Sequence, residues 1–266
     1  MKIPTNKILN GNAAEVLKTI PSAAVRLTLT SPPYDNLRDY DGFKFSFDEI
    51  ARELYRVTID GGVVVWIVAD GTKNGAETGT SFRQALTFCE IGFRLHDTMI
   101  FEKIHSNNIP NVAHKRFVQS FEYMFVLSKG APDVFNPLYT KSKSTWKGAR
   151  MKHARQKDGS DRVTMRAEQT IPGHRLLTNV WKIKSSTALN DYEKLVRKHP
   201  AVFPEELARR HVLAWSNPGD IILDPMCGSG TTLRVARQLR RRFIGIDTSK
   251  KYCRLARQRL LFKERK

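Results

Sequence analysis

Two glycines that stand directly before a predicted helix, with acids nearby, mark the segment best suited to bind a ligand. Residues 221–232 read IILDPMCGSGTT, in which Asp224 ends a predicted strand and Gly228 and Gly230 precede the helix. Glycine has no Cβ, so the backbone can approach a ligand closely, and the helix N-terminus adds free N–H groups. At about the distance of 20 residues that dinucleotide sites use, Asp247 ends the next predicted strand and can accept hydrogen bonds from a ribose. This combination predicts a site for a nucleoside-containing cofactor.

The residues of this loop discriminate between the common nucleoside cofactors. GSGTTL at 228–233 does not match the phosphate-binding motif GxxxxGK(S/T), and it lacks the third glycine of the dinucleotide motif GxGxxG. The carboxylate of Asp224 would repel a pyrophosphate, whereas it would attract a cation. S-adenosylmethionine carries an ammonium and a sulfonium group, so we expect it to be the cofactor.

A second segment with chemical potential is a stiff turn near the N-terminus. Residues 25–30 alternate and are rich in β-branched side chains, which predicts a strand, and Ser31-Pro32-Pro33-Tyr34 follows it. Proline cannot continue a ladder, so the turn lies at the carboxyl edge of the sheet, where open α/β sheets bind ligands. The Ser31 hydroxyl and the Pro32 carbonyl can accept hydrogen bonds from an amino group, and a base can stack on Tyr34. The turn therefore predicts a site for an amino-bearing nucleobase, and the competing interpretation is a plain strand end with a core tyrosine.

Together, the two segments resemble the motifs of a known family, the S-adenosylmethionine-dependent DNA amino-methyltransferases with the circularly permuted, β-type motif order. SPPY at 31–34 is similar to the catalytic turn of that family, and DPMCGSGTT at 224–232 is similar to its cofactor loop. HPAVFPEEL at 199–207 resembles the segment that precedes the loop, and FIGID at 243–247 resembles the ribose-binding strand. The resemblance covers nearly the whole chain outside a basic stretch.

The resemblance implies roles for residues in both segments. The implied catalytic residues are Ser31, Pro32, Pro33 and Tyr34. The implied cofactor-binding residues are Asn12, Thr30, Phe203, Pro204, Asp224, Pro225, Met226, Cys227, Gly228, Ser229, Gly230, Thr231, Asp247 and Thr248. Two of them depart from the family pattern, because Met226 replaces the usual phenylalanine and Asn12 stands where aspartate is frequent.

The implied reaction is methyl transfer to an exocyclic amino nitrogen of a base that has left the duplex. Hydrogen bonds from the amino group to Ser31 and to the Pro32 carbonyl would favour a pyramidal nitrogen, so that positioning and electrostatics carry the rate. In the family, serine at the first position of the turn goes mostly with cytosine N4, so we expect cytosine N4 as the target, with adenine N6 as the alternative. An RNA amino-methyltransferase and a non-catalytic nucleic-acid-binding protein are further alternatives. Methylation at cytosine C5 is not expected, because it needs a nucleophilic cysteine, usually after a proline, and Cys89, Cys227 and Cys253 do not follow one.

Predicted strands and helices alternate along most of the chain. The apolar patterns predict strands at 7–11, 25–30, 62–69, 96–102, 123–127, 220–223 and 243–246, and helices at 13–19, 47–57, 81–91, 204–215, 231–239 and 249–262. With the resemblance, this alternation predicts an α/β, Rossmann-like methyltransferase fold with a largely parallel central sheet. We expect three parts: the catalytic part of the core at 1–137, a target-recognition insertion at 138–184, and the cofactor-binding part of the same core at 185–266.

The charge of the chain is strongly positive and unevenly distributed. The 266 residues include 45 Lys and Arg against 26 Asp and Glu, a net charge of +19, which favours a polyanionic partner. Residues 138–184 hold 12 basic and 3 acidic residues, and residues 234–266 hold 13 and 2. The second block predicts either phosphate contacts or a solvated face. We expect the first block to bind double-stranded DNA through Lys141, Lys143, Lys147, Arg150, Lys152, Arg155, Lys157 and Arg162.

Cysteine use and hydropathy bound the cellular setting. Three widely spaced cysteines argue against a disulfide framework and against a cysteine-rich zinc site, and they favour a reducing compartment. The opening MKIPTNKILNGN lacks the apolar core of a signal peptide, and the longest apolar run, 62–69, is too short to cross a bilayer. We therefore expect a cytoplasmic protein with no metal and no membrane partner. A cognate restriction endonuclease and a homodimer stay open as partners.

Overall fold

The computed structural model describes residues 3–33, 45–104, 115–141, 150–155, 161–166, 173–184 and 204–262, with the backbone alone at 150–155 and 161–166. The chain separates into two compact units. The first comprises Met1–Asn136 and Asn179–Lys266, and the second comprises Pro137–Thr178. The first unit contains the large sheet and every helix of the described residues.

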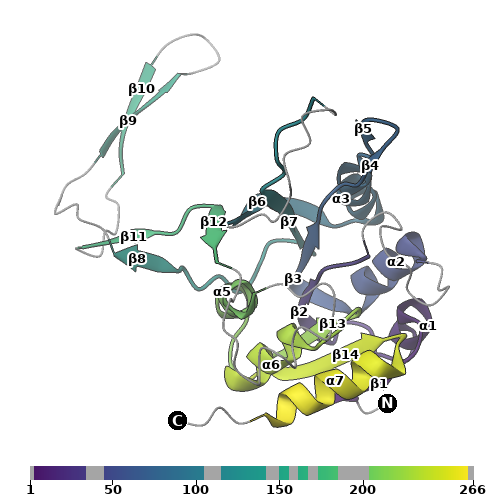
Figure 1. The fold of residues 1–266 in the computed structure, drawn as a ribbon. Helices are drawn as coiled ribbons and strands as arrows, with labels where there is room; N and C mark the ends of the chain where they lie inside the picture. The colour runs from purple at the N-terminus through teal and green to yellow at the C-terminus, as the bar shows by residue number, and fades with distance from the viewer. Residues whose placement is uncertain are drawn as a thin grey trace. The chain divides into compact units, whose positions relative to one another are not determined.

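An eight-stranded sheet forms the centre of the first unit (Figure 1), in the order β1-β14-β13-β2-β3-β7-β6-β12. β7 is antiparallel to both of its neighbours, and every other neighbouring pair is parallel. The strands are β1 (Lys7–Asn10), β2 (Val25–Thr30), β3 (Thr58–Val68), β6 (Arg94–Lys103), β7 (Phe121–Ser128), β12 (Val180–Ile183), β13 (Ile221–Asp224) and β14 (Arg242–Asp247). The predicted α/β fold with a largely parallel sheet is confirmed.

Helices cover both faces of this sheet, because its central strands are apolar on both sides. On β3, consecutive residues such as Val65 and Trp66 project to opposite faces and both are fully buried. Trp66 belongs to the core that α1, α2 and α3 cover. On the opposite face α5 packs against β2 and β3, with α6 and α7 following it. The helices of the described residues are α1 (Ala13–Leu17), α2 (Phe47–Val57), α3 (Thr80–Ile91), α5 (Glu205–Trp215), α6 (Thr231–Gln238) and α7 (Lys250–Leu261).

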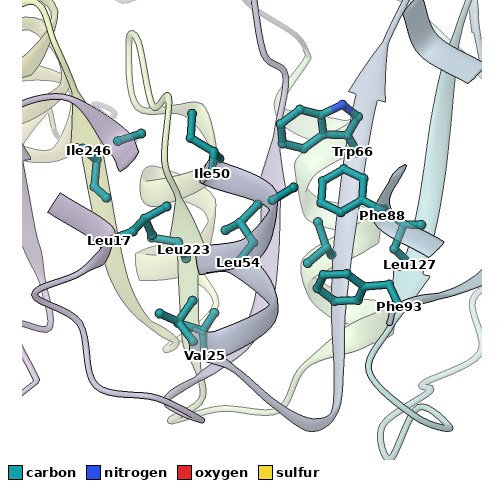
Figure 2. Close-up of a cluster of buried hydrophobic side chains, with 14 of the residues drawn as sticks. Leu17, Val25, Ile50, Leu54, Trp66, Phe88, Phe93, Leu127, Leu223 and Ile246 are labelled. Carbon is teal, nitrogen blue, oxygen red and sulfur yellow. The ribbon is translucent and has the colours of Figure 1, made fainter. Parts of the chain in front are cut away.

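The core beneath α1, α2 and α3 combines aromatic rings with branched side chains (Figure 2). Trp66 and Phe88 meet edge to face, with their ring centroids 5.1 Å apart. The indole Nε1 of Trp66 donates a 2.8 Å hydrogen bond to Oε1 of Gln84, so the polar atom of this buried ring is satisfied. Leu17 of α1 and Leu223 of β13 lie in the same cluster. This packing fixes the carboxyl ends of the central strands, where the two selected segments begin.

The second unit is built from short antiparallel ladders. β8 (Tyr139–Lys141) pairs with β11 (His174–Leu176), and β9 (Arg150–Arg155) pairs with β10 (Asp161–Arg166). A further small ladder, β4 (Thr72–Lys73) with β5 (Ala76–Glu77), lies in the first unit.

The end of the basic stretch differs from the expected boundary at 184. Residues 180–183 form β12, which pairs with β6 and therefore belongs to the large sheet. Trp181 and Ile183 alternate with exposed residues and are buried, 5% and 3% exposed, as an edge strand with one covered face requires.

Candidate active site

The two segments selected from the sequence follow neighbouring strands at the centre of the sheet. β13 and β2 are parallel neighbours, paired at Leu223 and Thr28. From β13 the chain continues through α6 to β14 on one side, and from β2 it continues through α2 to β3 on the other. Such a reversal of strand order is the place where open α/β sheets bind ligands, in the crevice beyond the carboxyl ends. The loop after Asp224 and the turn after Thr30 both begin at this place.

A buried hydrogen bond joins the two strand ends. The Thr30 hydroxyl donates to Oδ1 of Asp224 at 2.8 Å, and the backbone N–H of Met226 donates to the same oxygen at 3.2 Å. Thr30 is fully buried and Asp224 is 2% exposed. Burial raises the pKa of Asp224 from 3.8 to about 6, hydrogen bonds from Thr232, Thr30 and the Met226 N–H oppose this rise, and the charge of Asp247 adds to it. The site thus contains an acid that lacks a buried cationic partner of its own within the described residues.

Asp247, at the end of β14, fixes the other side of the loop. Its Oδ2 accepts a 2.8 Å hydrogen bond from the N–H of Gly228, and its Oδ1 accepts one from the N–H of Ser249 at 2.8 Å. Burial raises the pKa of Asp247, and these backbone hydrogen bonds partly offset the rise. Each carboxylate oxygen keeps further acceptor capacity, so these bonds leave room for the hydroxyl groups of a ribose.

The glycines of the loop are needed for two different reasons. Gly228 and Gly230 have φ angles of 47° and 78°, in the left-handed region that favours glycine. Gly230 also caps α6, and a Cβ there would stand 2.9 Å from the Cβ of Ala256. The loop is therefore held close to α7 at this point.

The remaining loop residues are tightly packed. Cys227 is 5% exposed, and burial raises its pKa well above the usual value, so it is a poor nucleophile. Pro225 is buried, and Met226 is half-buried against the core cluster. Ser229 and Thr231 are each 4% exposed, and both hydroxyls accept hydrogen bonds from the guanidinium of Arg259.

The catalytic turn is described as far as its second proline. Ser31 and Pro33 are half-buried and Pro32 is buried, directly beyond the end of β2. Tyr34, to which the sequence assigned base stacking, lies outside the described residues, as does Phe203.

Three further residues from the expected cofactor set lie near the strand ends. Asn12 caps α1, and its Oδ1 accepts a 2.9 Å hydrogen bond from the N–H of Ala14. Pro204 is the N-cap of α5 and is half-buried. Thr248 follows β14, and its carbonyl accepts a 2.8 Å hydrogen bond from Nδ2 of Asn10. Asn10 holds the end of β14 in this way, and sequence reasoning had given it no role.

The expected DNA-binding residues are only partly described. Lys141 is exposed on β8. The backbones of Arg150, Lys152 and Arg155 form β9, and that of Arg162 lies on β10. The others, Lys143, Lys147 and Lys157, lie outside the described residues.

Sequence reasoning missed the buried arginines of the C-terminal block. It predicted phosphate contacts or a solvated face, yet Arg234, Arg241 and Arg259 are 5%, 8% and 1% exposed. Arg241 donates to the carbonyl of Ser216 at 2.6 Å, and Arg259 pairs with Glu205 at 2.8 Å. The expectation was wrong for these residues, because each guanidinium finds its partners inside the fold.

Membrane-spanning helices and metal clusters are both absent from the described residues. Within those ranges, no helix is long and apolar enough to cross a membrane. The same part of the chain contains no group of three or more His, Cys, Asp or Glu side chains that could hold a metal ion.

Comparison with known proteins bears on the family. Residues 25–258 match the N6/N4 methyltransferase family, whose description is DNA methylase. The orphan methyltransferase M.BamHII of Bacillus amyloliquefaciens is 46% identical over 245 residues, 91% of each chain. The DNA adenine methyltransferase YhdJ of Escherichia coli strain K12 is 29% identical over 268 residues, 95% of this chain and 82% of YhdJ.

Solved structures agree with this family. A DNA modification methylase of Thermus thermophilus, TTHA0409, complexed with S-adenosyl-L-methionine, has a TM-score of 0.64 and 25% identity, over 96% of this chain and 92% of that chain. The cytosine-N4-specific PvuII DNA methyltransferase has a TM-score of 0.71 over 100% and 89% of the two chains, and at 18% identity it supports the fold alone. The chain belongs to the N6/N4 DNA methylase family, and it is a DNA methyltransferase.

Proposed function

We propose that this DNA methyltransferase transfers the methyl group of S-adenosylmethionine to the N4 amino group of cytosine in duplex DNA. The observation that carries the proposal is the 2.8 Å hydrogen bond between Thr30 and Asp224. It joins the turn that would hold the base to the loop that would hold the cofactor, at the reversal of strand order. Two ligands bound beyond these strand ends would meet.

The acids of the loop fit S-adenosylmethionine better than a phosphate-bearing cofactor. Burial and mutual repulsion raise the pKa of Asp224, and burial raises that of Asp247. A cation bound nearby stabilises both carboxylates, whereas a phosphate would destabilise them. S-adenosylmethionine provides two cationic groups, and its sulfonium supplies the methyl group when it is bound. We assign Asp224 to the cationic end and Asp247 to the ribose.

The turn after β2 would hold the target base. The Ser31 hydroxyl and the Pro32 carbonyl accept the two hydrogens of the amino group, which turns the nitrogen lone pair towards the methyl group. Pro32 and Pro33 keep these acceptors at fixed positions, because both φ angles are locked. Tyr34 stacks on the base, a contact of roughly 1–3 kcal/mol. No covalent intermediate with the enzyme is needed.

Cytosine N4 is the proposed target because of the first residue of the turn. Serine at position 31 resembles the turns of the cytosine-N4 enzymes in the family, where aspartate goes mostly with adenine. Adenine N6 is the second candidate, and the relative YhdJ, with the word adenine in its name, is the observation that favours it. Both reactions would use the same acceptors at Ser31 and Pro32.

The β9–β10 hairpin would position the duplex. Arg150 pairs with Arg166, Lys152 with Thr164, and Ala154 with Arg162, so four basic residues share one face of the hairpin. The other face carries Arg155, which stands opposite Asp161. A two-stranded β-ribbon fits the major groove of B-DNA, and a basic face suits its phosphates. We therefore assign the duplex contacts to the first face and none to Arg155.

A transfer assay with labelled S-adenosylmethionine tests the proposed function. The protein is expected to label duplex DNA and to leave RNA of the same sequence unlabelled. Ser31→Ala is expected to lose turnover while it retains cofactor binding, because Ser31 contacts the base and not the cofactor. Label on RNA alone would contradict the assignment to DNA.

A further inference from the structure

One buried guanidinium holds the middle of the cofactor loop. Nη1 of Arg259 donates to the hydroxyls of Ser229 and Thr231 at 2.9 and 2.7 Å, and to the carbonyl of Ser229 at 3.3 Å. Arg259 lies on α7 and is 1% exposed. A single nitrogen on another element thus contacts three oxygens of the loop, on the stretch that leads from Gly228 into α6.

The second nitrogen of the same guanidinium reaches α5. Nη2 of Arg259 donates to Oε1 of Glu205 at 2.8 Å, in the first turn of α5 and directly after Pro204. Nε of Arg234 lies 3.3 Å from the same carboxylate oxygen. Nη1 of Arg234 donates to the carbonyls of Arg259 and Phe262, each at 3.0 Å. One carboxylate therefore connects α5, α6 and α7 behind the loop.

The planar shape of arginine explains why this connection sets a distance. A guanidinium presents its donors in a rigid fork, so the oxygens bound to Nη1 and Nη2 stand at a fixed separation. Ser229 and Thr231 are thereby held at a fixed position relative to Glu205 and to Pro204 beside it. A lysine at position 259 could neutralise Glu205, but its single nitrogen could not hold both sides in this geometry.

We propose that Arg259 is a positioning residue that sets the affinity of the loop for S-adenosylmethionine. The proposal rests on the proposed function in one respect, that this loop and Pro204 bind the cofactor. Arg259 contacts neither cofactor nor DNA in this account, and it acts through Ser229, Thr231 and Glu205. Its loss therefore changes cofactor binding and leaves the methyl-transfer step intact.

Two substitutions test the proposal on the folded protein. Arg259→Lys keeps the charge and removes the fork, and Glu205→Asp shortens the arm that holds Arg259. Each is expected to raise the dissociation constant of S-adenosylmethionine about tenfold, the scale of a lost charged hydrogen bond. The constant is measured by calorimetry, after circular dichroism has shown that the variant is folded. The turnover rate at saturating cofactor and the DNA affinity are expected to stay within about twofold of wild type.

The chain offers a matched control on the same helix. Glu206 pairs with Arg210 at 2.8 Å on the surface of α5, so Glu206→Asp makes the same change one residue away. This variant is expected to bind the cofactor as wild type does. If the folded Arg259→Lys and Glu205→Asp proteins bind it equally well, Arg259 is structural only and the proposal is overturned. A wild-type protein that binds no S-adenosylmethionine would instead contradict the proposed function itself.

Discussion

The Thr30 hydroxyl donates a 2.8 Å hydrogen bond to Oδ1 of Asp224, at the point where β2 and β13 end side by side. Both residues are almost completely buried. The bond joins two segments that are 194 residues apart in the chain. It holds the turn that carries Ser31 in register with the loop that carries the glycines.

Thr30→Val is expected to destabilise the protein by about 1–3 kcal/mol, because it leaves a buried carboxyl oxygen without its side-chain donor. Thr28 on the same strand is the matched control. It is equally buried, and its hydroxyl has no hydrogen-bond partner within the described part of the chain. Thr28→Val is therefore expected to be neutral or stabilising, as measured by urea unfolding. Equal losses from both variants would show that the bond to Asp224 contributes nothing.

Asp224 makes stability depend on pH in a defined window. Its folded pKa is raised from 3.8 to about 6, so between these values the unfolded carboxyl releases a proton that the folded one keeps. The stability that this carboxyl contributes is present below pH 4 and is lost as the pH rises to 6, by roughly 3 kcal/mol. Without cofactor, Asp224→Asn is therefore expected to gain stability relative to wild type across this window. Parallel stability curves for the two proteins from about pH 4 to 7 would contradict the assigned shift.

Gly230→Ala tests the close approach of the loop to α7. The added Cβ would meet the Cβ of Ala256 at 2.9 Å, at a φ of 78°. Strain and overpacking together predict a loss of about 2–4 kcal/mol in the free energy of unfolding. Gly75 has a φ of 75° and nothing within 4 Å of its Cβ position, so Gly75→Ala carries the strain alone, about 1 kcal/mol. A similar loss at both positions would mean that the contact with Ala256 costs nothing.

The sequence predicts the elements that carry the site well, because their apolar patterns are local. The alternating run at 25–30 and the amphipathic pattern at 47–57 coincide with β2 and α2. The acids at the ends of β13 and β14 were found from the same patterns. β12 was missed, because a four-residue edge strand has too little periodicity to stand out.

The buried charges could not be predicted from the sequence. Arginine is almost never fully buried unless it is paired, so Arg259 in a basic block indicates a solvated position. Its partner Glu205 is 54 residues away, and no local spacing connects them. The role of Asn12 as the cap of α1 was also missed, although the asparagine directly precedes the helix.

The face assigned to the β9–β10 hairpin predicts the salt dependence of DNA binding. Arg150→Ala, Lys152→Ala and Arg162→Ala are each expected to weaken binding and to lower the slope of log K against log salt by about 1. Arg155→Ala changes a residue of the same strand on the opposite face and is expected to leave the slope unchanged. Binding is measured by fluorescence anisotropy from low to moderate salt. If Arg155→Ala lowers the slope as much as the other three, the assignment of the faces is wrong.

The base that receives the methyl group is the most direct test of the central claim. Duplex DNA is methylated by the purified protein, digested to nucleosides and analysed by mass spectrometry. The account predicts N4-methylcytosine, formed at the acceptors of Ser31 and Pro32 and absent with Ser31→Ala. N6-methyladenine as the only modified nucleoside would contradict it.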